Sequence, residues 1–85
     1  MATTNQELYE KLQKYLQLKK ELEQTIKNSE KWIEEAKDEK NETELEVAQW
    51  SLERNQLLLE AVELAISDIT TFLNDRWAEI KEGDL

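Results

Sequence analysis

The side chains in this sequence that could act as catalytic bases are carboxylates and lysines, because the chain contains neither histidine nor cysteine. Histidine is the commonest general base and metal ligand, and thiolates are the usual ligands of structural zinc. Glu34 and Glu35 form an adjacent carboxylate pair, but successive residues of a helix do not share a face. The other glutamates lack the spacing of a Ca²⁺ cage, and Gly83 is the only glycine, so a glycine-rich phosphate loop is excluded. We therefore expect no enzyme activity, no metal and no other cofactor.

The apolar residues recur at spacings that predict helices instead of a catalytic scaffold. In the first half of the chain, steps of three and four residues follow a heptad, abcdefg, with apolar residues mainly at a and d. The a positions are Leu12, Lys19, Ile26 and Ile33, and the d positions are Leu8, Tyr15, Leu22, Ser29 and Ala36. Positions b, c and f are polar here, so we expect an amphipathic helix with a single apolar side.

Capping signals predict where the helices begin. Thr4-Asn5-Gln6-Glu7 and Thr43-Glu44-Leu45-Glu46 both fit a capping box, in which a threonine hydroxyl and a glutamate satisfy free N–H groups at the helix start. The residues between the helices carry no large apolar side chain, which is typical of a turn. We predict one domain with helices over about residues 4–38 and 43–82, joined by a turn at about 39–42.

The second helix repeats the heptad. Its a positions are Leu45, Leu52, Leu59, Ile66, Leu73 and Ile80, and its d positions are Ala48, Asn55, Val62, Ile69 and Arg76. If the chain folds back on itself, the two seams meet in register, with Ala36 facing Leu45 and Leu22 facing Leu59. The predicted fold class is therefore all-α, a coiled-coil-like antiparallel two-helix hairpin that completes a bundle with a partner or a second copy.

Four polar residues interrupt this seam: Lys19, Ser29, Asn55 and Arg76. Lys19 can carry its ammonium group to water on its aliphatic stem. Asn55, opposite Ile26, could fix the register, as single buried asparagines do in coiled coils. We favour the simpler interpretation, in which these layers are half exposed. A break of the first helix near Asn28-Ser29, giving three helices, is the weaker alternative because the heptad continues through that point.

The second helix has more apolar surface than the first helix can cover. Its g, c and f columns, which are contiguous with a and d, contain Leu58, Ala65, Phe72, Val47, Ala61, Trp50, Leu57, Leu64 and Ala78. A helix that is apolar over more than half of its circumference is normally buried on two sides, and a large exposed apolar patch indicates an interface. The predicted interface consists of Trp50, Leu57, Leu58, Ala61, Leu64 and Phe72, with Leu18 and Trp32 of the first helix at its edge.

The charge balance limits the class of partner. The formal net charge is −9, and acidic surfaces repel nucleic acid and anionic membranes, so we expect neither as a partner. The longest apolar run, Leu57-Leu58-Leu59, is far shorter than the roughly 20 residues of a membrane-spanning helix. Residues 1–5 lack the basic region and apolar run of a signal peptide, and we expect a cytoplasmic protein.

The segment Asn55-Gln56-Leu57-Leu58-Leu59-Glu60-Ala61-Val62-Glu63-Leu64-Ala65 resembles the small E-type co-chaperones of type III secretion systems (the YscE/SsaE-like family). This resemblance, which is best over residues 49–77, implies an antiparallel helical hairpin that pairs with a larger, tetratricopeptide-like chaperone. In that family the pair keeps a needle subunit unpolymerised, and one branch serves a translocator subunit. The secreted hairpins that carry Trp-x-Gly at their turn share the topology, but the turn of this chain has neither residue.

The sequence therefore predicts an adaptor or co-chaperone that binds another helical protein, either a chaperone or a secreted subunit, by burying a helix in a groove. One alternative is a structural homodimer, in which two hairpins form a four-helix bundle. A second alternative is an acidic inhibitor that mimics nucleic acid, such as a phage anti-defence protein.

Overall fold

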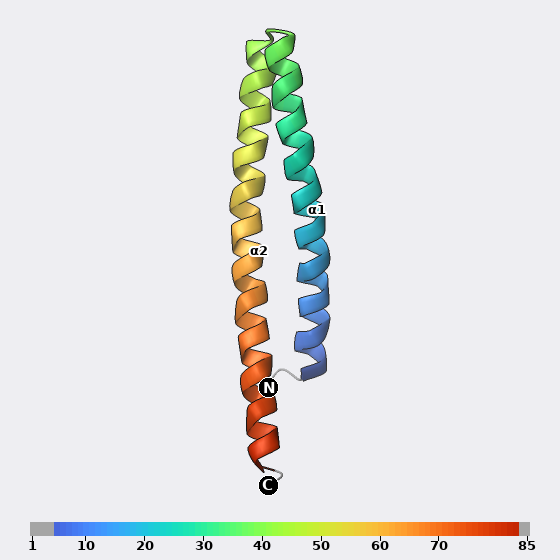
Figure 1. Ribbon diagram of the computed structural model, residues 1–85, viewed down its shortest axis with the longest axis vertical. Coiled ribbons are helices and arrows are strands. Elements are labelled where there is room, and N and C mark those ends of the chain that lie inside the picture. The colour runs from blue at the N-terminus through green and yellow to red at the C-terminus, as the bar shows by residue number, and fades with distance from the viewer. Residues whose placement is uncertain (1–4, 84–85) are drawn as a thin grey trace.

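The computed structural model of this chain consists of two helices, α1 (Asn5–Asp38) and α2 (Glu42–Gly83), which lie side by side as an antiparallel hairpin (Figure 1). The structure describes the backbone of residues 5–83 and the side chains of residues 5–75. The molecule is a rod with extents of 67 × 23 × 14 Å. The predicted hairpin is confirmed, and α1 runs unbroken through residues 28–29, so the three-helix alternative is wrong.

Some of the predicted positions fall outside the described part of the chain. Thr4, the expected cap of α1, is one of them, and so are the side chains of Arg76, Ala78 and Ile80. The helix bounds that can be compared lie within one residue of those predicted from the sequence.

The turn begins with a backbone motif that ends α1. The Asn41 N–H donates to the Ala36 carbonyl at 3.0 Å, and the Lys40 N–H donates to the Lys37 carbonyl at 3.2 Å. These two bonds make a Schellman motif, in which the residue that follows the C-cap adopts a left-handed conformation. Lys40 takes that position with a φ of 56°, although glycine is the residue that adopts it without steric cost.

Asn41 caps α2, in place of Thr43, which the sequence pattern predicted as the cap. The Glu44 N–H donates to Asn41 Oδ1 at 3.1 Å, and the Leu45 N–H donates to the Asn41 carbonyl at 3.0 Å. The helix therefore starts at Glu42, and the predicted capping box at Thr43 is wrong because Thr43 lies inside the first turn. Asparagine is among the strongest N-caps. The Schellman motif already orients Asn41 at the point where α2 begins.

Lys40→Gly should raise the free energy of unfolding by about 0.5–1 kcal/mol, seen as a higher melting temperature. The left-handed conformation costs an L-residue about 1–2 kcal/mol, and the greater freedom of glycine in the unfolded chain offsets part of that gain. Lys31→Gly, at an exposed position inside α1, is the matched control and should lower stability by about 1 kcal/mol. A Lys40→Gly protein that melts below the wild type would contradict the assignment of a left-handed turn residue.

The packing between the helices is centred on the d positions. The buried residues of the described chain all lie at d: Leu22, Ser29, Ala36, Ala48, Asn55 and Val62. The a residues within the described range are half-buried, which confirms that the heptad seam forms the core. Because a and g flank d on a helix, a contact centred on d also covers part of the g column. Ser51 and Ala65, both at g, are accordingly half-buried.

A small polar cluster lies within this seam. Ser29 Oγ is 3.2 Å from Ser51 Oγ on the opposite helix, and Asn55 Nδ2 donates to the Ser51 carbonyl at 2.7 Å and to Ser51 Oγ at 3.3 Å. Ser29 is only 4% exposed and Asn55 only 8%, so the expectation that these layers are half exposed is wrong for both. Their small side chains fit between two close helices, and the hydrogen bonds make burial of their polar groups tolerable. Lys19 is half-buried.

Candidate protein interface

The exposed face of α2 carries the predicted interface residues, which we call the apolar strip: Trp50, Leu57, Leu58, Ala61, Leu64 and Phe72. Among the large apolar side chains of residues 5–75, Trp50, Leu57 and Leu64 are the most exposed, at 62%, 67% and 65%. Leu58 and Phe72 are 42% and 47% accessible, and Ala61 is also exposed. Steps of three, four and seven residues place these side chains on one face of the helix. Burial of each large one would contribute up to about 1.5–3 kcal/mol.

The two edge residues from α1 behave differently. Leu18 is exposed and extends the strip onto α1, as predicted from its g position. Trp32, also at g, is half-buried, so the expectation that it belongs to the uncovered surface is wrong in part. Because g lies next to d on a helix, packing centred on d leaves less of Trp32 available to a partner.

Three further apolar residues are exposed, and two of them, Tyr9 and Leu16, were not expected from the sequence. Tyr9 and Leu16 are exposed at consecutive e positions of α1, on the opposite edge of the seam from Leu18. Their seven-residue spacing was the available signal, and it shows that α1 has apolar side chains beyond its single expected stripe. The third, Val47, belongs to the apolar columns predicted for α2 but not to the predicted interface; it is exposed and extends the strip towards the turn.

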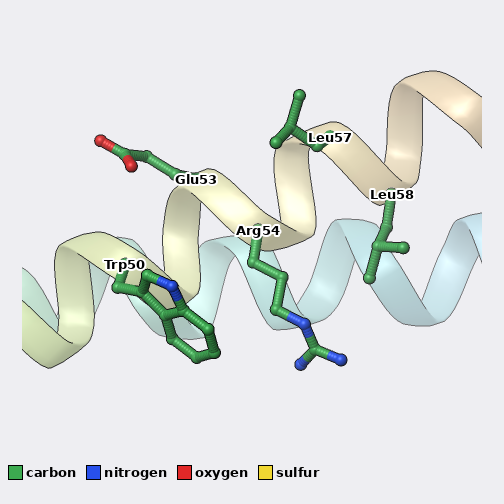
Figure 2. A pocket seen from close by; sticks show the side chains of 5 residues that line it. All are labelled: Trp50, Glu53, Arg54, Leu57 and Leu58. Atoms are coloured by element: carbon green, nitrogen blue, oxygen red, sulfur yellow. The ribbon is translucent and has the colours of Figure 1, made fainter.

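A shallow depression of about 410 Å³ lies at the turn-side end of the strip and is lined by Trp50, Glu53, Arg54, Leu57 and Leu58. In Figure 2 the side chains of Trp50, Arg54 and Leu58 extend toward the lower edge of α2, and those of Glu53 and Leu57 extend toward its upper edge. Arg54 Cζ lies 5.8 Å from the centroid of the Trp50 ring, a cation–π contact worth about 0.5–1 kcal/mol at an exposed site. A depression this shallow suits an apolar side chain of another protein better than a small ligand, which needs a deeper cleft.

Carboxylates border the strip on the side away from α1. Glu46, Glu53 and Glu60 follow each other at seven-residue intervals in the b column, and all three are exposed. Charges at the rim of an interface stay solvated and influence the rate and orientation of association more than its affinity. The arrangement is therefore an apolar surface with an acidic border.

The described residues offer little other chemistry. Among them, no three Asp or Glu side chains come together in a way that could hold a metal ion. Neither helix, as far as it is described, has a stretch long and apolar enough to cross a lipid bilayer. Every buried side-chain nitrogen or oxygen in that part of the chain has a hydrogen-bond partner. The apolar strip is thus the feature of the described surface that is best suited to binding.

Comparison with known proteins supplies no family to which the chain can be assigned. No family model, no curated protein and no solved structure matches it.

Proposed function

We propose that this chain is a protein-binding adaptor or co-chaperone whose apolar strip is buried in a groove of a larger helical partner. The observation that carries the proposal is the exposure of Trp50, Leu57 and Leu64, each of which is more than 60% accessible on one face of α2. Tryptophan is enriched among the residues that dominate binding energy at interfaces. Exposed apolar area of this extent favours association.

The resemblance to type III secretion co-chaperones suggests a more specific role. On that basis the partner is a tetratricopeptide-like chaperone in the cytoplasm, and the complex keeps a needle or translocator subunit soluble. The segment that carries the resemblance, Asn55 to Ala65, includes four residues of the apolar strip: Leu57, Leu58, Ala61 and Leu64. A groove-binding partner is also the arrangement that an amphipathic helix with an uncovered face favours.

Capture of the tagged chain from its native cell tests this proposal. The wild type should co-purify one helical partner, and Leu57→Ser should lose it because a polar side chain replaces a central contact. Leu16→Ser is the matched control, since Leu16 is exposed on the other edge of the hairpin, and it should retain the partner. Circular dichroism of each variant confirms that the hairpin is still folded. If Leu57→Ser captures the partner as well as the wild type does, the strip is not the binding surface.

A further inference from the structure

The apolar strip has a charge pattern that is complementary to itself. The strip follows the c, f and g columns of α2, and between Val47 and Phe72 these columns contain two charged residues, Arg54 and Asp68. Both are at c, both are exposed, and each lies seven residues from Ala61, on opposite sides. A basic and an acidic residue are therefore placed symmetrically about the small residue at the centre of the strip.

When two copies of α2 are placed antiparallel with Ala61 against Ala61, each residue of one strip faces a complementary residue of the other. Arg54 then faces Asp68 of the second copy, and by two-fold symmetry this ion pair occurs twice. The same register sets the two largest side chains together, Trp50 against Phe72. It also sets Leu58 against Leu64, and the alanine at the centre lets the two backbones approach closely. The heptad makes the apolar pairs follow from one another, but the pairing of opposite charges is an independent match.

We propose that a second copy of this chain covers the apolar strip when no other partner is present, in an antiparallel dimer centred on Ala61. The acidic border supports this direction. Glu46 and Glu53 lie in the half of the b column near the turn, whereas Ser67 and Asn74 occupy that column towards the open end. Antiparallel pairing brings the acidic half level with the uncharged half, and a parallel arrangement would bring the two acidic halves together, where like charges repel.

One border residue weakens the dimer. Glu60 lies next to the two-fold axis, so it approaches Glu60 of the second copy, and each chain has a net charge of −9. The dimer is therefore weak enough for a partner to displace the second copy. The dimer rests on the proposed function only because both use the same surface. The second copy occupies the strip before the partner binds, so self-association competes with partner binding.

Charge reversal tests the ion pair. Arg54→Glu and Asp68→Arg should each raise the dimer dissociation constant about tenfold or more, because each places like charges opposite one another. The double variant Arg54→Glu/Asp68→Arg should restore the wild-type value. Lys20→Glu is the control, since it changes the net charge as Arg54→Glu does but lies on an exposed face of α1 away from the strip. Sedimentation equilibrium over a concentration series gives the dissociation constants.

Cysteine cross-linking tests the register, because the chain contains no cysteine of its own. Under mild oxidation Ala61→Cys should form a disulfide dimer, since the two substituted positions face each other within the Cα separation that a disulfide spans. Leu57→Cys should not, because its two copies would be displaced by about 12 Å along the helix axis. Both variants are compared at the same concentration with circular dichroism as the check on folding.

Three outcomes would overturn the dimer: a sharp monomer peak at millimolar concentration without binding of an apolar dye, equal cross-linking at the two cysteine positions, or a double charge variant no better than the single ones. If any of these occurs while the tagged chain still captures a partner through Leu57, the proposed function stands and only the self-pairing fails. If the dimer behaves as described but no partner is captured, the proposed function fails and the dimer stands.

Discussion

Leu22→Ala and Leu59→Ala should each lower the free energy of unfolding by about 2–5 kcal/mol, whereas Trp50→Ala should lower it by less than about 1 kcal/mol. Leu22 is 8% exposed at the centre of the seam and Leu59 is half-buried at an a position, so truncation leaves a cavity between the helices. Trp50 is 62% exposed, and its loss removes little beyond the contact with Arg54. The total stability of a domain this small is of the same order as the loss at Leu22, so the seam variants should be largely unfolded at 37 °C.

Thermal and urea melts of the three variants should be recorded at low micromolar and at high concentration. At low concentration Trp50→Ala should melt close to the wild type. At high concentration its melting temperature should be lower than that of the wild type. The wild type gains stability from self-association by mass action, and the variant gains less. The seam variants should be unstable at both concentrations. If Trp50→Ala unfolds the dilute chain as severely as Leu59→Ala does, then Trp50 belongs to the core and the assignment of faces is wrong.

Partner binding through the apolar strip should change little in affinity between about 0.1 and 0.5 M NaCl, and Leu57→Ser should weaken it about a hundredfold. Apolar burial supplies the free energy of such a complex, and salt does not weaken that term over this range. The border residues Glu46, Glu53 and Glu60 are exposed, so salt should alter the association rate more than the dissociation constant. Titrations of the purified complex at several salt concentrations measure both quantities.

If the protein were a nucleic-acid mimic, its affinity for its partner would depend on salt in the opposite way. Its affinity would come from many carboxylates that face a basic cleft, so it should fall a hundredfold or more over the same salt range. Leu57→Ser should then be harmless, because that side chain would not touch the partner. Observation of both effects together would remove the co-chaperone proposal and favour the acidic inhibitor. Leu16→Ser, a substitution of the same kind away from the strip, controls for general effects of losing a leucine.

The sequence by itself determined the features of this protein that depend on spacing along the chain. The heptad requires only that residues three and four apart share a helix face, so it identified both helices, their antiparallel pairing and the seam that contains Leu22 and Val62. The same arithmetic located the apolar strip, because Trp50, Leu57 and Leu64 fall in one column whatever packs beside it. The exposure of these three side chains in the folded hairpin agrees with that prediction.

The turn shows where local signals compete. Asn41 and Thr43 could each cap α2, and both are followed three residues later by a glutamate. The choice of Asn41 depends on how α1 ends, because the Schellman motif at Lys40 fixes the direction in which the chain leaves the first helix. Two adjacent motifs share Asn41, and pattern matching applied to one helix at a time does not represent that coupling.

Only the tertiary structure decided where the contact between the helices is centred and how close they come. A heptad treats a and d alike, but the packing centres on d, and this buries Ser29 and Asn55 and leaves Trp32 half-buried. The burial of Ser29 depends on a hydroxyl from the other helix, Ser51, which is 22 residues away in the sequence and 3.2 Å away in space. The separation of two helices is set jointly by all the side chains between them, so no single column of the sequence contains it.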